Sequence, residues 1–135
     1  MAQTKRVTYF KTMLEDRPGT GLAFAQSLKS KNVGLTALWA YGTQTGQSEV
    51  YCIPKDADKF RTFAKSAGMT VWEGIGFFLK GTDRTGALVK NLDALAKAGI
   101  NVTAVHAIAA AGNYGAFMRV PDADLEEAAR ALGAK

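Results

Sequence analysis

The sequence predicts an α+β protein built from two tandem βαββαβ units, each an antiparallel sheet with two helices on one face. The main observation is a repeat: the motif Asp16–Gly19 (Asp-Arg-Pro-Gly) recurs 67 positions later as Asp83–Gly86 (Asp-Arg-Thr-Gly). Each motif follows a strand-like segment, precedes a helix-like run and leads to a second β-branched segment. One half of the 135-residue chain is therefore a copy of the other half, and this determines the fold class.

The first repeat, residues 1–73, contains every element of one such unit. Pro18 suits the first turn of a helix, where its missing N–H costs nothing, and Gly68 is placed to end the second helix. Runs rich in β-branched and aromatic residues mark the strands. The expected elements are a strand over residues 6–13, a helix from 18 to about 31, strands over 33–41 and 49–53, a helix over 54–67 and a strand over 69–72.

The second repeat, residues 74–135, has the same order of elements but lacks a fourth strand before Lys135. In this ferredoxin-like arrangement the fourth strand flanks the first, so its loss would leave a bare sheet edge. We expect a neighbouring chain or the other repeat to cover that edge. The expected elements are a strand over 74–80, a helix with apolar positions Leu88, Leu92, Leu95 and Ala96, strands over 100–109 and 115–120, and a helix from Pro121.

Composition is that of a globular protein, with 47% hydrophobic and 21% charged residues. The N-terminal residues show no signal-peptide pattern and no run is long enough to span a membrane, so we expect a cytoplasmic protein. The net charge of +5 comes from the first repeat. Its basic residues are either a solvated helix face or a weak surface for an anionic partner. Four of them lie on one expected helix, namely Lys55, Lys59, Arg61 and Lys65.

The sequence offers no catalytic constellation. We find no nucleophile–base pair and no paired carboxylates in a pocket context. His106 is the only histidine and Cys52 the only cysteine, and together they cannot supply a dedicated zinc site. Cys52 lies in the middle of an expected strand and is interpreted as an inert, half-buried thiol. We therefore expect no cofactor, no metal and no enzymatic activity.

Two ferredoxin-like units, each with an Asp-Arg-(Pro/Thr)-Gly turn between the first strand and the first helix, resemble the ACT domain family. The resemblance covers nearly the whole chain, as a tandem pair of ACT-like units. Domains of this family are typically sensors of free amino acids or similar small ligands, and they pair side by side. The resemblance therefore implies a non-catalytic regulatory protein that acts on a protein partner or forms a homo-oligomer.

The resemblance also implies where a ligand would bind, between the first turn of one unit and the second strand of the other. One such site combines Asp16, Pro18 and Gly19 with Asn101. The second site combines Asp83, Thr85 and Gly86 with Gly34, which brings no side chain.

These residue types fit the two charges of an amino acid. A glycine lets the backbone approach a ligand closely. The helix N-terminus beyond it offers N–H groups and a partial positive charge to a carboxylate. The aspartate can accept hydrogen bonds from an α-ammonium group, and Asn101 can both donate and accept.

Two alternatives remain open. The chain could be an architectural module that oligomerises through its sheet edges and binds no small ligand. It could also bind nucleic acid through the basic first repeat, in which case the affinity would fall steeply with salt.

Overall fold

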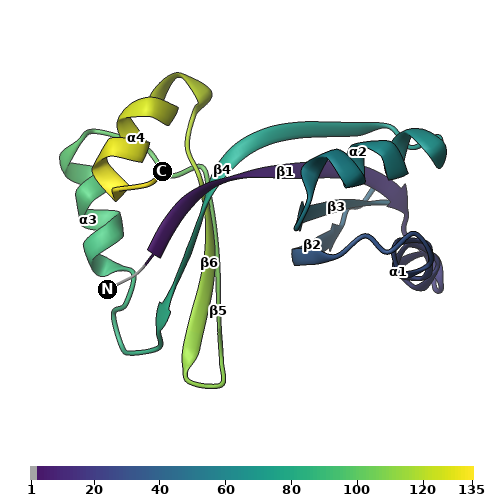
Figure 1. Cartoon of the computed structure of the whole chain (residues 1–135), viewed down its shortest axis with the longest axis horizontal. Helices are drawn as coiled ribbons and strands as arrows, with labels where there is room; N and C mark the ends of the chain where they lie inside the picture. The colour runs from purple at the N-terminus through teal and green to yellow at the C-terminus, as the bar shows by residue number, and fades with distance from the viewer. Residues whose placement is uncertain (1–2) are drawn as a thin grey trace. The chain divides into compact units, whose positions relative to one another are not determined.

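The computed structural model describes residues 3–135, which form an α+β fold with a six-stranded antiparallel sheet and four α-helices (Figure 1). The sheet order is β2-β3-β1-β4-β6-β5. Two compact units are present. The 8–74 unit comprises Thr8–Gly74, and the C-terminal unit comprises the described residues up to Val7 together with Ile75–Lys135. Strands β1 and β4 each contribute to both units.

In the 8–74 unit both helices pack on one face of the strands. Phe24 and Leu28 of α1 share a core with Phe60 of α2 and with Phe10 and Cys52 of the sheet. The strand order is β2-β3-β1-β4, and Phe10 pairs with Cys52 in the β1–β3 ladder. The elements are β1 (Gln3–Glu15), α1 (Thr20–Ser30), β2 (Leu35–Gly42), β3 (Gln47–Pro54), α2 (Ala57–Ser66) and the first residues of β4 (Val71–Thr82).

The C-terminal unit repeats this plan, with strand order β1-β4-β6-β5. The strand that the second repeat lacks is provided by the first residues of the chain, since β1 up to Val7 belongs to this unit beside β4. The core lies between the strands and the two helices and contains Phe77, Leu79, Leu95 and Met118. The remaining elements are α3 (Val89–Lys97), β5 (Ala104–Ala110), β6 (Asn113–Arg119), a 3-10 turn (Asp122–Asp124) and α4 (Leu125–Leu132).

An ion pair ties the N-terminal strand to the rest of this unit. Arg6 Nη1 and Nη2 donate to the two carboxylate oxygens of Glu126 on α4, at 2.7 and 2.8 Å. The hydrogen bond from Arg6 and its positive charge lower the pKa of Glu126. The Arg6 backbone N–H also donates to the Lys135 carbonyl, at 3.3 Å. The first and last parts of the described chain are therefore bonded to each other inside one unit.

The ends of the second helix of each repeat are closed in the same way. Gly68 and Gly133 both adopt a φ of +66°, which favours glycine. The residue after each glycine donates to the carbonyl five residues before it, Met69 to Ala64 and Ala134 to Ala129, both at 2.9 Å. This match makes Phe63 of α2 and Ala128 of α4 equivalent positions. The predicted helix end at Gly68 is confirmed.

The sequence misplaced some boundaries. The two strands expected over 69–72 and 74–80 are one continuous strand, β4, so the junction between the repeats is not a break. Helix α2 begins at Ala57 rather than at Pro54, because the Asp56 carboxylate caps it by accepting from the Lys59 N–H at 3.1 Å. Helix α1 begins at Thr20, two residues after Pro18.

The predicted apolar stripe of α3 is also partly wrong. Leu88 and Leu95 contact the core, but Leu92 is 38% exposed and Ala96 is exposed. Helix α3 begins only at Val89, with Leu88 as its cap. The core-facing side of this segment carries Leu88, Leu95 and Ala98, whereas Leu92 and Ala96 lie outside it.

Two glycine substitutions test this packing. Gly76 is buried in β4, and a Cβ there would lie 2.5 Å from Phe117 Cε1 and 3.1 Å from the Met118 carbonyl oxygen. Gly76→Ala should therefore lower the free energy of unfolding by about 1–3 kcal/mol, as overpacked cores do. Gly21→Ala is the matched control, because nothing lies within 4 Å of its Cβ position in α1. It should raise stability by about 0.5–1 kcal/mol. Urea denaturation measures both; equal midpoints for Gly76→Ala and the unmodified chain would contradict the packing described.

Candidate functional site

The two Asp-Arg-x-Gly turns share one backbone arrangement. The Asp16 N–H donates to the Gly46 carbonyl at 3.0 Å, and the Asp83 N–H donates to the Gly112 carbonyl at 2.9 Å. Each bond joins the turn before the first helix of a repeat to the hairpin turn between its second and third strands. The sequence repeat is therefore matched by a repeated local structure.

The glycine of each turn has a left-handed backbone. The φ angle is +91° at Gly19 and +77° at Gly86, a region that L side chains rarely adopt. Space is not the constraint, since nothing lies within 4 Å of a Cβ built at Gly19 and only Val89 Cγ2, at 3.5 Å, approaches one at Gly86. These glycines permit the turn. A valine at Gly19 would strain the turn itself, so that change does not report on a ligand.

The helices that follow the turns begin without side-chain caps. Neither α1 nor α3 has a capping hydrogen bond or an acidic residue in its first turn. Thr85 lies in the exposed turn and does not cap α3, whose cap residue is Leu88. Uncapped helix N-termini keep N–H groups and a partial positive charge available to an anion.

At the first turn a carboxylate lies at the end of the second strand. Asp16 Oδ2 is 3.0 Å from the Cβ position of Gly42, the last residue of β2, so this glycine leaves room for the aspartate. Asp16 is exposed and forms no ion pair within residues 3–135. The neighbouring Arg17 pairs instead with Glu15, Nε to Oε2 at 2.9 Å. Pro18 is exposed between them and the helix.

The two residues predicted to complete the sites lie at the opposite ends of the helices. Gly34 follows α1, and its carbonyl accepts from the Lys55 N–H at 2.9 Å. Asn101 is exposed between α3 and β5, not on the strand as predicted, because β5 begins only at Ala104. The 11 residues of α1 rise about 16 Å, so Gly34 does not meet Gly19 within its own unit. The pairing of each turn with a residue of the other repeat stays a prediction.

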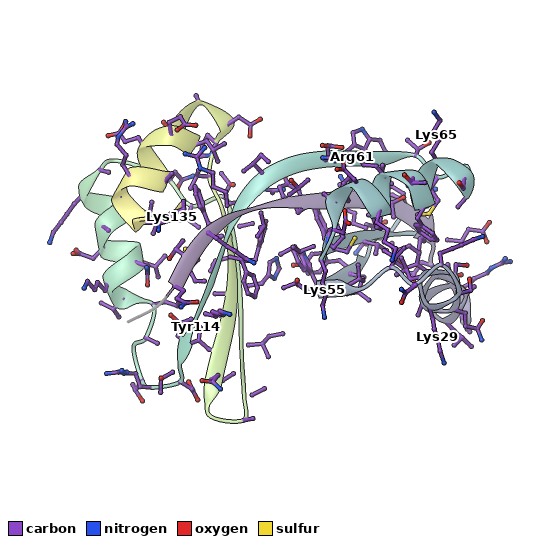
Figure 2. The ribbon with its side chains drawn as sticks, viewed as in Figure 1. Lys29, Lys55, Arg61, Lys65, Tyr114 and Lys135 are labelled. Carbon is purple, nitrogen blue, oxygen red and sulfur yellow. The ribbon has the colours of Figure 1, made fainter. Side chains whose placement is uncertain are left out.

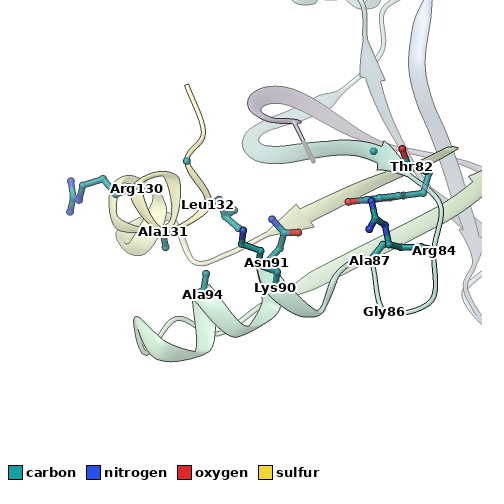
Figure 3. Close-up of a pocket in the computed structure, with 13 residues that line it drawn as sticks. Thr82, Arg84, Gly86, Ala87, Lys90, Asn91, Ala94, Arg130, Ala131 and Leu132 are labelled. Atoms are coloured by element: carbon teal, nitrogen blue, oxygen red, sulfur yellow. The ribbon is translucent and has the colours of Figure 1, made fainter. Parts of the chain in front are cut away.

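The second turn opens into a hollow that the sequence analysis does not predict. This α3–α4 hollow, of about 650 Å³, is lined by the end of β4, two residues of the turn, one side of α3, the end of α4 and Tyr114 (Figure 3). Arg84 and Gly86 of the motif line it, together with Lys90 and Asn91. It lies entirely within the C-terminal unit. The one residue that could have indicated the hollow from the sequence is Asn91, a polar residue on the side of α3 that faces the core.

Lys29, Lys55, Arg61 and Lys65 of the 8–74 unit do not form one patch. Arg61 donates to both Glu73 carboxylate oxygens at 2.9 Å and to Asp58 at 2.6 Å, and its hydrogen bonds lower the pKa of Glu73. Figure 2 shows Lys65 pointing away from the side on which Lys55 and Lys29 project. This arrangement gives no continuous basic surface among these residues, so it does not favour the nucleic-acid alternative.

Within residues 3–135, no group of three or more His, Cys, Asp or Glu side chains could hold a metal ion. None of the helices there combines the length and the apolar character needed to cross a membrane.

Several solved structures have a fold similar to that of this chain. The chain is similar to the protein BT0572 of Bacteroides thetaiotaomicron, with a TM-score of 0.84 and 18% identity over 96% of this chain and 88% of that one. It is also similar to the regulatory subunits of aspartate kinase from Thermus thermophilus, in a ligand-free form, and Thermus flavus. Their TM-scores are 0.66 and 0.60, each at 14% identity over 98% of this chain and 94% of theirs.

No protein-family model and no curated protein sequence matches the chain. The structural likenesses agree with the α+β class and support an ACT-like fold. At identities below one fifth they show the fold alone.

Cys52 provides a direct check on the interior of the 8–74 unit. The side chain is 3% exposed, more buried than the sequence suggested, and burial raises the pKa of its thiol to about 12. The reactive thiolate is therefore nearly absent at pH 8 in the folded protein, whereas an exposed cysteine titrates near 8.5. We expect Ellman's reagent to label the native protein slowly and the urea-unfolded protein at once. Rapid labelling without urea would show that this core opens.

Proposed function

We propose that this chain is a non-catalytic regulatory protein that binds a free amino acid at its duplicated turns. The observation that carries the proposal is the repeated Asp-Arg-x-Gly turn, which has the same hydrogen bond and the same left-handed glycine in both units. Because the same turn precedes an uncapped helix in both units, each copy could bind the same class of ligand.

The turn offers complementary groups to both ends of an amino acid. The first N–H of each helix, from Thr20 and Val89, donates to the turn carbonyls of Arg17 and Gly86 at 3.3 and 3.0 Å. The N–H groups that follow them in α1 and α3 are the proposed donors to the α-carboxylate. The Asp16 or Asp83 carboxylate can accept from the α-ammonium group. Both aspartates are exposed, so a ligand can reach them. Asn101 remains the proposed side-chain contact from the other repeat.

The ACT-like fold supports a regulatory role, because two similar structures are regulatory subunits of aspartate kinase. Transferred to this chain, the role is that of a sensor acting on another protein or on a second copy of itself. A bound amino acid would stabilise the form that binds it. It would shift a partner only through unequal affinity for two states.

A thermal-shift screen against the common amino acids tests the proposal. One amino acid, or a related group, should raise the melting temperature with increasing concentration; ligand at 100 times its Kd adds about 2.7 kcal/mol of stability. Titration calorimetry would then give the Kd. A flat screen at millimolar concentration would count against the sensor.

Substitution at the turns locates the binding. Asp16→Asn and Asp83→Asn should each weaken the affinity of their own site by about tenfold or more, since each removes a charged hydrogen bond worth roughly 1.5–3 kcal/mol. Asn101→Ala should weaken the first site. Glu127→Gln removes the same charge from an exposed position on α4 and is the control. Unchanged affinity in the Asp16, Asp83 and Asn101 variants would refute the assigned site.

A second candidate, the architectural module, is favoured by the two edge strands. Exposed apolar side chains lie on β2 and β5, with Leu38 51%, Tyr41 45%, Val105 45% and Ile108 75% exposed. Exposed strand edges pair readily with other chains. If the ligand screen is flat and light scattering shows an oligomer that Ile108→Lys dissociates, this candidate replaces the sensor.

A further inference from the structure

The α3–α4 hollow differs from the turn site, because side chains of α3 and α4 form most of its lining, although Gly86 of the turn also contributes to it. Its size, about 650 Å³, lies within the range of small-molecule pockets. Ala87, Ala94 and Leu132 give it an apolar lining, and Arg84, Lys90 and Asn91 give it polar groups. Apolar walls with a few convergent polar groups are typical of sites for small organic ligands.

The charged groups that line the hollow are all positive. No carboxylate lines it, and within residues 3–135 neither Arg84 nor Lys90 forms an ion pair. Figure 3 shows Arg84 reaching back from the turn toward Thr82, and Lys90 and Asn91 rising from α3 on the same side. Arg130 also contributes to the lining, but its guanidinium group points away. On α3, the acidic residue nearest in sequence to Lys90 is Asp93, and it forms an ion pair with Lys97 at 2.8 Å.

Tyr114 adds one more polar group to the hollow. It is only 8% exposed, it belongs to the core of the unit, and it lines the hollow. Within residues 3–135 its hydroxyl forms no hydrogen bond, and the hydroxyl oxygen itself is not fully buried. This hydroxyl can therefore bond to solvent or to a ligand in the hollow.

The 8–74 unit shows what would fill such a hollow. By the sequence repeat, the position of Asn91 corresponds to Phe24, and by the matched helix ends the position of Ala128 corresponds to Phe63. Both phenylalanines are buried and their rings lie 6.4 Å apart, so they occupy the space between the two helices. In the C-terminal unit the corresponding residues are Asn91, whose amide lines the hollow, and Ala128, whose small methyl group is fully buried in the core. The hollow is therefore a specific feature of this unit.

We propose that the α3–α4 hollow binds a small organic anion. Its oxyanion group, a phosphate or a carboxylate, receives hydrogen bonds from Arg84 and Lys90, and the Asn91 amide and the Tyr114 hydroxyl complete the polar contacts. Arginine suits this role because its planar fork donates two parallel bonds to such groups. The apolar part of the ligand lies on Ala87, Ala94 and Leu132. The inference does not rest on the proposed amino acid site.

Calorimetric titration at low ionic strength tests the proposal with three probes that share one ring: phenyl phosphate, benzoate and benzyl alcohol. At least one anion should bind saturably, while the neutral alcohol should bind at least about tenfold more weakly. The tighter anion identifies the headgroup. No saturable binding of either anion at millimolar concentration, or equal binding of the alcohol, would overturn the proposal.

Point substitutions in the full chain test whether the anion binds in the α3–α4 hollow. Arg84→Gln and Lys90→Gln should each weaken the anion by about tenfold or more. Arg130→Gln, which removes the same charge from a side chain that points away, should change the Kd by less than about twofold. Asn91→Phe, which copies the 8–74 unit, should abolish binding. Circular dichroism and melting curves confirm folding; if Asn91→Phe fails to fold, Lys90→Gln at an exposed position keeps the test decisive.

Two results would refute the location: an unchanged Kd in Arg84→Gln and Lys90→Gln, or an equal loss in Arg130→Gln, which would indicate general charge attraction. Asp83→Asn separates this site from the proposed function. It should weaken an amino acid but not phenyl phosphate or benzoate, because Asp83 does not line the hollow. A flat amino acid screen with anion binding intact would leave this site standing alone.

Discussion

The C-terminal unit depends on a strand that lies far from it in sequence. Its sheet is completed by β1 up to Val7, and Arg6 fixes that segment through two bonds to Glu126 and one to Lys135. This strand covers the sheet edge that the second repeat, which lacks its own fourth strand, would otherwise expose. Thr8–Gly74 is consequently an insertion within the other unit rather than the first of two units joined end to end. The organisation of the chain follows from this one strand pairing.

The two units use the same backbone plan for different interiors. The 8–74 unit places Phe10, Phe24, Phe60 and Phe63 between sheet and helices, with ring centroids 4.6 to 6.4 Å apart along the cluster. The C-terminal unit has fewer aromatic side chains in its core, Phe77 and Tyr114 beside mainly aliphatic residues, and leaves the end of its interhelical space open at Asn91. Duplication preserved the turns and the helix ends, while the residues between the helices diverged. Chemical specialisation is therefore expected between the helices as well as at the shared turns.

The sequence was sufficient for what depends on local geometry. The repeated motif, the helix-ending Gly68 and the α+β class follow from turn chemistry and periodicity, and the structure agrees. The sequence alone does not identify the supplier of the missing strand, because pairing across about 70 residues has no local signature. The β-branched neighbours of Asn101 predict a strand there, although β5 begins three residues later. The hollow is not predictable from Asn91 alone, because its polarity is unusual only in comparison with Phe24, its counterpart in the repeat.

The position of the N-terminal strand also bears on how the protein is made. Residues 3–7 leave the ribosome before their strand partner in β4 and their anchor on α4, which follow more than 60 residues later. At roughly 5–20 residues per second, the Thr8–Gly74 unit can fold while this segment still waits for its sheet. During those seconds an unpaired strand is presented to the translation machinery and its chaperones. Final closure of the molecule, marked by the Arg6–Glu126 pair, is thus postponed until synthesis of α4 is complete.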